Sequence, residues 1–226
     1  MIGVVTGLKS EIATLEAAWR GAGFAFFAAG GSAARAETAV RDMVSRGAKL
    51  LVSAGLAGGL DPGLEPGDAV LAEAVAAPDG RSYPADASLR ERLAGALAAA
   101  NLRWSGGVLL GSDRAVLGAA DKAALHRRTR AACADMESHG VTRVAAALEV
   151  PLVVLRVIAD PAGRAIPASA LAGMAPDGAT RALPVLGRLL LRPWEVPAIA
   201  RLARDSRRAH EALGRLAFAV RGVLVG

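Results

Sequence analysis

Three carboxylates stand at points where an expected strand gives way to a helix or a loop. Glu11 follows the apolar run of residues 2–6, Glu137 opens a helix within Asp135-Met136-Glu137-Ser138, and Asp160 comes just after the apolar run 152–158. In an open α/β sheet, ligands bind at the carboxyl ends of the strands. A single acid at a helix start or a turn has an ordinary structural explanation. Three such acids together indicate a site for acid–base catalysis or for binding ligand hydroxyl groups.

A single cation interrupts the most apolar of the expected strands. Arg156 lies within residues 152–158, where every other side chain is apolar. An unpaired charge in a protein interior is costly, so a charged partner for Arg156 is expected.

The elements that must position these residues alternate between strands and helices. Hydrophobic residues make up 53% of the 226 residues and aromatic residues 4%, which excludes a disordered chain and suits closely packed α/β layers. The sequence predicts one domain over residues 1–226, a three-layer α/β/α sandwich, with an atypical Ala-, Leu- and Arg-rich part from about residue 161. Strands are expected at residues 2–6, 24–29, 50–54, 68–76, 107–111 and 152–158.

Local signals predict how particular elements begin or end. The glycines of residues 55–59 predict a close turn after the strand 50–54, because only small residues allow it. Ser88 and Glu91 have the spacing of a capping box, which predicts a helix start. The final helix is amphipathic, with arginines opposite its apolar side. It is expected to cover the sheet or form a dimer face, and contact with a membrane surface is the alternative.

Charge, cysteine and histidine content narrow the possible partners. The formal net charge of +6 permits anionic partners. A basic run without interleaved aromatic residues is formed by Lys122, His126, Arg127, Arg128 and Arg130, so a solvated helix face is expected rather than nucleic-acid binding. Cys133 is the only cysteine and should be buried, and the three histidines lack ligand spacing, so no metal is predicted. The absence of a signal-peptide pattern and of a long apolar stretch predicts a cytoplasmic protein.

Several segments together resemble the nucleoside phosphorylase and methylthioadenosine/S-adenosylhomocysteine nucleosidase superfamily. The resemblance rests on Asp135-Met136-Glu137-Ser138 with the later strand and Asp160, on Ala54-Gly55-Leu56-Ala57-Gly58-Gly59-Leu60 with Pro66-Gly67-Asp68, on Ile2-Gly3-Val4-Val5 with Glu11, and on Gly111-Ser112-Asp113. It covers residues 1–160 in order, whereas the C-terminal part departs from the usual family ending. It implies a nucleoside phosphorylase-like fold with a mixed central sheet, and a homodimer.

The resemblance also implies a reaction and a role for each site residue. Enzymes of this family split the N-glycosidic bond of a purine nucleoside through an oxocarbenium-like sugar. Asp160 would protonate the leaving base, Glu137 would bind the ribose hydroxyls and stabilise the cation, and Glu11 would activate a water. Met136 would pack on the sugar, and Arg156 would orient the neighbouring acids. The other residues expected to contact the substrate are Asp135, Gly30, Gly55, Leu56 and Ser112.

Water is the expected nucleophile. Phosphorylases of this family place an Arg just before the glycine-rich segment and a Ser within it, where this chain has Ser53 and Leu56. Nucleosidases also keep that Ser, so Leu56 departs from both groups. Glu11 matches the nucleosidase acid, and a carboxylate repels a phosphate dianion in the same pocket. Arg35 and Arg114 leave inorganic phosphate open as a co-substrate, and no other cofactor is expected.

The C-terminal part indicates a nucleoside with a large apolar 5′ group. Residues after Asp160 are largely Ala, Leu and Pro, with Ile166 and Met174, which would suit an apolar channel. The pattern resembles the hopanoid-associated subgroup of the family, whose members are linked to removing adenine from adenosylhopane to give ribosylhopane. A location at the periphery of the inner membrane would fit such a substrate. Two alternatives stay open: a nucleosidase for methylthioadenosine or S-adenosylhomocysteine, and a catalytically silent nucleoside-binding or membrane-associated scaffold.

Overall fold

Three parallel strands form the centre of the sheet. They are β1 (Ile2–Thr6), β3 (Leu50–Gly59) and β10 (Leu152–Asp160), with β3 paired to β1 and to β10. The computed structural model describes residues 1–21, 23–173, 175 and 177–226. The near-continuous apolar sequences of these strands fit burial on both faces of a parallel sheet. Their carboxyl ends meet at one edge, which is the edge that the three predicted acids share.

Shorter strands complete a mixed sheet. β9 (Cys133–Asp135) pairs antiparallel with β3, and β4 (Ala69–Leu71) pairs antiparallel with β10. The remaining strands are β2 (Phe24–Ala28), β5 (Ala74–Ala76), β6 (Ser82–Pro84), β7 (Trp104–Ser105) and β8 (Val108–Gly111). The strand order is β6-β5-β8-β9-β3-β10-β4-β7, with β1 on β3 and β2 on β1. The predicted mixed central sheet is therefore confirmed.

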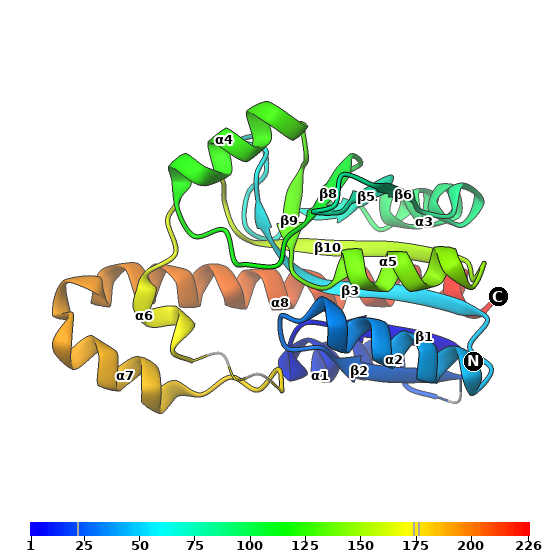
Figure 1. Cartoon of the computed structure of the whole chain (residues 1–226), viewed down its shortest axis with the longest axis horizontal. Helices are drawn as coiled ribbons and strands as arrows, with labels where there is room; N and C mark the ends of the chain where they lie inside the picture. The colour runs from blue at the N-terminus through cyan, green and yellow to red at the C-terminus, as the bar shows by residue number, and fades with distance from the viewer. Residues whose placement is uncertain (22, 174, 176) are drawn as a thin grey trace.

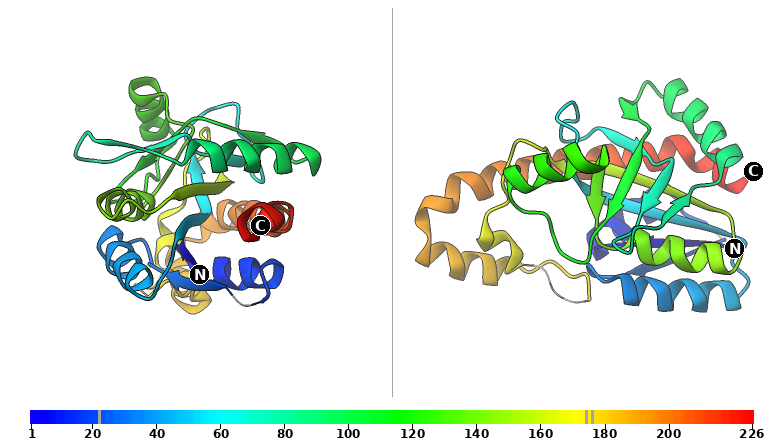
Figure 2. Two further views of the ribbon diagram at one scale, coloured as in Figure 1. Left: turned by 90° about the vertical axis from the view of Figure 1, so that its right-hand side faces the viewer. Right: turned by 45° about the horizontal axis from the view of Figure 1, so that its top comes forward.

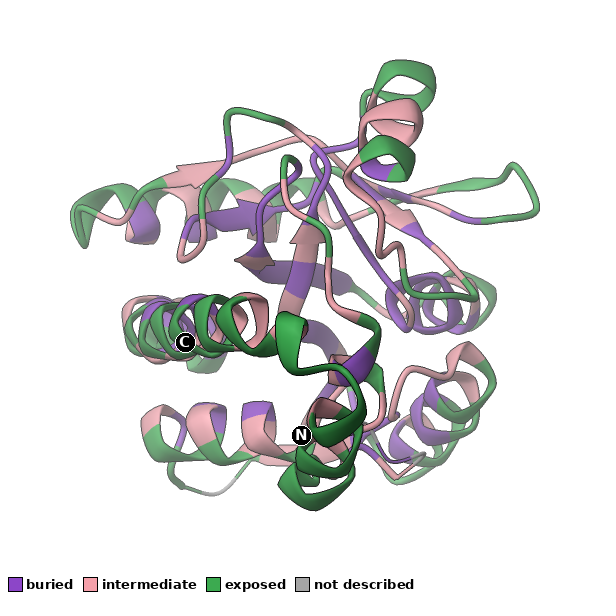
Figure 3. Cartoon of the chain, turned by 90° about the vertical axis from the view of Figure 1, so that its left-hand side faces the viewer, coloured by how far each residue is buried: buried purple, intermediate pink, exposed green. Residues whose placement is uncertain are grey.

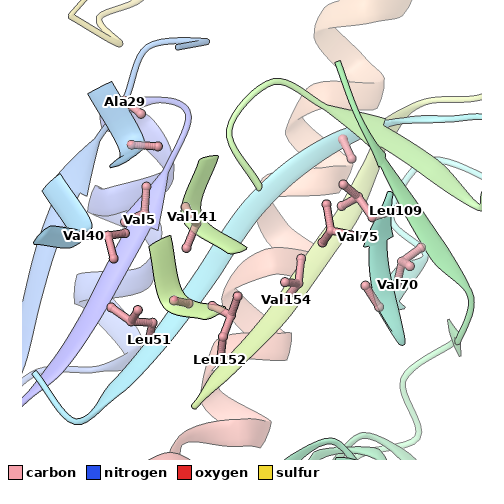
Figure 4. Close-up of a cluster of buried hydrophobic side chains, with 14 of the residues drawn as sticks. Val5, Ala29, Val40, Leu51, Val70, Val75, Leu109, Val141, Leu152 and Val154 are labelled. Atoms are coloured by element: carbon pink, nitrogen blue, oxygen red, sulfur yellow. The ribbon is translucent and has the colours of Figure 1, made fainter. Parts of the chain in front are cut away.

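Helices cover both faces of this sheet, as the left view of Figure 2 shows. α2 (Ala33–Ser45) and α5 (Ser138–Ala147) pack on one face, and α1 (Lys9–Ala18), α3 (Ala87–Ala99) and α8 (Val196–Val225) pack on the other. Successive strand residues point to opposite faces, so Val5 and Val154 join the core under α2 and α5 (Figure 4), whereas Val4 joins the core under α1 and α8. The predicted three-layer α/β/α fold is confirmed.

Three local predictions were wrong in detail. Residues 55–59 are not a turn, because β3 continues through them to Gly59 while pairing with β10 and β9. Residues 68–76 form two short strands, β4 and β5, rather than one. The side chain that caps α3 belongs to Asp86, which accepts a hydrogen bond from the Leu89 backbone N–H, so Ser88 does not cap the helix.

The C-terminal segments extend beyond the sheet, at the left of Figure 1. α6 (Ala168–Leu171), α7 (Ala182–Leu191) and the 3-10 helix η1 (Pro193–Glu195) lead into the 30-residue helix α8. The second half of α8 packs on β10, α1 and α3, which confirms that this helix covers the sheet. α7 contains no buried residue, and Figure 3 draws this end of the molecule as mostly exposed. Among the described residues, no helix has the length and apolar character needed to cross a bilayer.

Candidate active site

A cavity of about 340 Å³ opens at the carboxyl ends of β1, β3 and β10. Glu11, Glu137 and Asp160 all line it, each arriving from a different element. All three side chains are largely buried, with exposed fractions of 2%, 7% and 7%. The acids that the sequence places near three strand ends therefore share one hollow.

Glu11 is fixed by backbone N–H groups at the start of α1. Its Oε2 accepts hydrogen bonds from the backbone N–H of Gly7 (2.9 Å) and Leu8 (2.8 Å), and its Oε1 accepts one from Leu56 (2.8 Å). Burial raises the pKa of the carboxyl, while these N–H donors and the charge of Arg156 oppose the rise. Gly55 leaves room for Glu11, because a Cβ there would lie 2.7 Å from Oε2.

Glu137 is the residue immediately before helix α5, which begins at Ser138. Its Oε1 accepts a hydrogen bond from the backbone N–H of Gly31 at 2.7 Å. Burial raises the pKa of this carboxyl to about 8, and the negative charges of Asp135 and Glu11 add to the rise. A carboxyl group in this position can accept hydrogen bonds from a ligand, and its ionised form is costly until a cation approaches.

Asp160 ends β10 and forms an ion pair with Lys122 of α4 (Ala119–Thr129). The Lys122 side chain is fully buried, so the expectation that this lysine belongs to a solvated helix face was wrong. The rest of the basic run fits that expectation, since Arg127, Arg128 and Arg130 are exposed. Burial raises the pKa of Asp160, and the Lys122 ammonium acts against that rise.

A buried network lies behind the acids. Arg156 donates to Asp135 through Nε (2.8 Å) and Nη2 (2.5 Å), and its Nη2 also reaches the hydroxyls of Ser53 (2.8 Å) and Ser138 (2.9 Å). Asp135 is thus the charged partner expected for Arg156. The Ser138 hydroxyl and backbone N–H both donate to Asp135, which ties the start of α5, and hence Glu137, to β10.

The structure gathers most of the predicted site residues but not all of them. Seven line the cavity: Glu11, Leu56, Ser112, Asp135, Met136, Glu137 and Asp160. Three described residues lie outside its lining, so their contact with substrate stays a prediction: Gly30, Gly55 and Arg156. Gly30 donates its backbone N–H to the Gly7 carbonyl, and the other two support acids rather than reach the cavity.

Several lining residues were missed by the sequence analysis. Gly31 is one residue beyond the predicted Gly30, and Lys122 had no local signal, because its partner lies 38 residues away. The part of the wall after Asp160 is mostly apolar and comes from Ile166, Ala170, Leu171 and Leu202. Ile166 was among the residues expected there, whereas Met174 lies outside the described residues.

Ser53, which stands where phosphorylases have an Arg, and the two possible phosphate donors Arg35 and Arg114 lie in different places. Ser53 is fully buried in the Arg156 network, and Arg35 lies over the Phe27 ring and near the Ala28 carbonyl, outside the cavity lining. Arg114 does line the cavity. Within the described ranges, no cluster of three or more His, Cys, Asp and Glu side chains is arranged to hold a metal ion.

Solved structures with a similar fold include nucleosidases. The 5′-methylthioadenosine/S-adenosylhomocysteine nucleosidase of Neisseria meningitidis, in complex with methylthio-immucillin-A, has a TM-score of 0.75 at 17% identity, with 98% of each chain covered. The Helicobacter pylori enzyme of the same name has a TM-score of 0.72 at 16% identity, covering 99% of this chain and 97% of that one. A futalosine hydrolase mutant of Helicobacter pylori has a TM-score of 0.62 at 19% identity, covering 70% of this chain and 88% of that one.

Sequence comparison identifies the family. No curated protein sequence matches the chain significantly. The sequence model of the Phosphorylase superfamily matches residues 29–192. This range includes Glu137, Asp160 and the central strands β3 and β10, but not β1. With the mixed sheet and the cavity at its carboxyl edge, this match establishes that the chain belongs to the Phosphorylase superfamily.

Proposed function

We propose that this protein is a nucleosidase that cleaves the N-glycosidic bond of an adenine nucleoside with water. The observation that carries the proposal is the convergence of Glu11, Glu137 and Asp160 on one cavity. Acid, base and cation-stabilising carboxylate are the three groups that such a cleavage needs, because the base is a poor leaving group and the sugar becomes cationic.

Each acid has one role in the proposed reaction. The bond between C1′ and N9 breaks, its electron pair goes to the base, and the Asp160 proton moves to N7. Glu137 accepts hydrogen bonds from the ribose hydroxyls and stabilises the cationic sugar. Glu11 takes a proton from a water whose oxygen bonds to C1′, so the proton gained by Glu11 balances the one lost by Asp160.

The charges of the cavity favour water over phosphate as the nucleophile. Four carboxyl groups line it (Glu11, Asp135, Glu137 and Asp160) against the two cations Lys122 and Arg114. Lys122 is already paired with Asp160. A phosphate dianion would be repelled by Glu11, which is ionised as the proposed base, whereas a water accepts and donates hydrogen bonds freely.

We propose adenosylhopane as the substrate and ribosylhopane as the product. The apolar side chains of Ile166, Leu171 and Leu202 give the cavity a wall that suits a hydrocarbon 5′ group. These residues belong to the C-terminal part in which the sequence departs from the usual family ending. Leu56 stands where members of the family keep a Ser in the glycine-rich segment, and its apolar side chain adds to the cavity wall.

We propose that α7 and η1 rest on an anionic bilayer, where a hydrocarbon-bearing substrate would reside. Leu183, Leu190, Leu191 and Trp194 are 71–85% exposed, so their apolar surface is unpaired within the described chain. Arg181, immediately before α7, and Arg188 within it are also exposed. Exposed leucines and a tryptophan beside arginines match the apolar interior and the negative headgroups of such a surface.

Adenine release by the purified protein tests the proposed function. Adenosylhopane and methylthioadenosine are each incubated with and without inorganic phosphate, and adenine and sugar products are quantified. The proposal expects adenine and ribosylhopane from adenosylhopane at a rate that phosphate does not change. A ribosyl phosphate product would replace hydrolysis with phosphorolysis. Adenine release from methylthioadenosine alone would replace the proposed substrate.

Methylthioadenosine or S-adenosylhomocysteine cleavage is the second candidate. It is favoured by the similarity of fold over 98% of this chain to a nucleosidase of that name. A catalytically silent scaffold is separated from both by Glu137→Gln and Asp160→Asn, because a scaffold would lose nothing measurable. The homodimer and the cytoplasmic location stay predictions, and sedimentation velocity and cell fractionation test them.

A further inference from the structure

Lys122 is a fully buried cation in the cavity wall with all of its donors in use. Its Nζ donates to Asp160 Oδ2, to the Pro161 carbonyl (3.1 Å) and to the Arg164 carbonyl (3.0 Å). An ammonium group has three N–H donors, so none is left for a ligand. Lys122 therefore lines the cavity without being able to bind substrate by a hydrogen bond, and its effect on a ligand must pass through Asp160.

The ion pair makes the two oxygens of Asp160 unequal. Oδ2 accepts a hydrogen bond from Lys122, whereas no protein group within the described residues donates a hydrogen bond to Oδ1. Gly58 lies beside this carboxyl, where an added Cβ would sit 3.3 Å from Oδ2 and 3.6 Å from Oδ1. One oxygen is thus anchored, and the other remains for a group in the cavity.

Two carbonyl contacts extend the same restraint to the chain that follows. Pro161 and Arg164 belong to the segment directly after β10, and Arg164 is also ion-paired with Asp205 of α8. Lys122 consequently joins α4 to the end of β10 and to the segment that leads to the apolar wall. A buried ammonium is costly unless it is paired and fully hydrogen-bonded, and here it is both.

We propose that Lys122 is a positioning residue for Asp160: it anchors Oδ2, leaves Oδ1 for the purine, and stabilises the carboxylate that remains once N7 has taken the proton. This inference rests on the proposed function. The O–H bond at Asp160 breaks as the N7–H bond forms, and the negative charge left on Asp160 lies against the ammonium throughout. Burial raises the pKa of Asp160 and so favours its protonated form. The Lys122 ammonium acts against that rise, which makes it easier for the proton to leave.

The test is a double-mutant cycle on adenine release from adenosylhopane, or from methylthioadenosine if the wild type prefers it. Lys122→Met is expected to lower kcat about 10–100-fold, less than the roughly 10²–10⁴-fold that general acid catalysis supplies, because Asp160 itself remains, with KM changed less than about threefold. Lys122→Arg should recover part of the loss, because it restores the charge. Lys49→Met is the matched control, since Lys49 is exposed, and should keep wild-type kcat.

The decisive comparison is made in the Asp160→Asn background. There, Lys122→Met should lower kcat by less than about threefold, because the group through which Lys122 acts is gone. An undiminished effect in that background, or full kcat in a folded Lys122→Met protein, would overturn the proposal. If Lys122→Met does not fold, the kcat of Asp160→Asn is compared with that of the variant carrying both Lys122→Met and Asp160→Asn. In this double variant both charges of the ion pair are removed, so neither is left unpaired. Equal kcat then supports the proposal, and a further loss overturns it. Failure of the proposed function appears separately, as no adenine release from the wild type.

Discussion

Glu11 and Glu137 face one cavity from different elements, and the charge of Glu11 contributes to the raised pKa of Glu137. Burial is the largest cause of the rise, followed by Asp135 and then Glu11, and together they bring the pKa to about 8. The cavity therefore stores unfavourable electrostatic energy when its acids are ionised. A cationic sugar between these carboxylates would relieve that energy, which is the condition for transition-state stabilisation.

The raised pKa makes a prediction about stability. Glu137 titrates near 4.5 when unfolded and near 8 when folded, so between these values the unfolded state binds fewer protons and stability falls as pH rises. Glu137→Gln removes the penalty while keeping an acceptor for the Gly31 N–H. We expect the variant to melt at the same temperature as the wild type near pH 4.5. At pH 8.5 it should melt at a higher temperature, by about 2–4 °C for each kcal/mol by which the free energy of unfolding increases.

Differential scanning calorimetry across this pH range measures the effect. Glu91→Gln is the control, because Glu91 is exposed on α3, and its melting temperature should follow that of the wild type at every pH. A Glu137→Gln difference that stays constant from pH 4.5 to 8.5 would contradict the assignment of the raised pKa.

The Arg156–Asp135 pair is expected to contribute strongly to stability. Arg156→Met leaves Asp135 as a buried, uncompensated carboxylate, which should lower the free energy of unfolding by about 3–5 kcal/mol. Urea unfolding followed by circular dichroism gives this value. Arg127→Met, at an exposed site on α4, should change it by less than about 0.5 kcal/mol. A small effect of Arg156→Met would show that the network is dispensable for folding.

Gly55 is expected to be needed for the placement of Glu11. Its φ of +151° and the 2.7 Å between an added Cβ and Glu11 Oε2 leave no room for a side chain. Gly55→Ala should therefore displace Glu11 and reduce kcat by at least about 10-fold, since proton transfer depends on position. Gly95→Ala, on α3 with open space around it, should retain wild-type kcat. Adenine release by both variants is the measurement, and an active Gly55→Ala protein would remove Glu11 from the proposed mechanism.

The exposed leucines of α7 are expected to bind anionic vesicles. The wild type should sediment with phosphatidylglycerol-containing vesicles more strongly than with phosphatidylcholine alone, because Arg181 and Arg188 add attraction to negative headgroups. Replacing Leu190 and Leu191 by Glu should reduce binding about 10-fold or more, because apolar burial and charge are both altered. Equal binding by the variant would exclude the bilayer as the partner of α7. Self-association that this double replacement abolishes would assign the surface to a second copy of the chain.

Much of the fold follows from local patterns. Apolar runs gave the central strands β1 and β10 and the first half of β3, because a parallel strand buried on both faces needs apolar residues throughout. The glycines of residues 55–59 predict a close turn, because only small residues allow it. Pairing of β3 with β10 on one side and β9 on the other keeps them extended, and no local signal carries that information.

Local sequence patterns were enough to predict the fold class and the placement of Glu11, Glu137 and Asp160 at strand ends, because both depend on residues close together along the chain. The burial of Lys122 against Asp160, and the position of Arg156 behind the cavity, where it supports Asp135, depend on how distant segments pack. An amphipathic pattern shows which side of a helix is apolar, but a charged residue can be buried wherever folding supplies its partner. For Lys122 that partner is 38 residues away along the chain, and the contact exists only once α4 packs beside the end of β10.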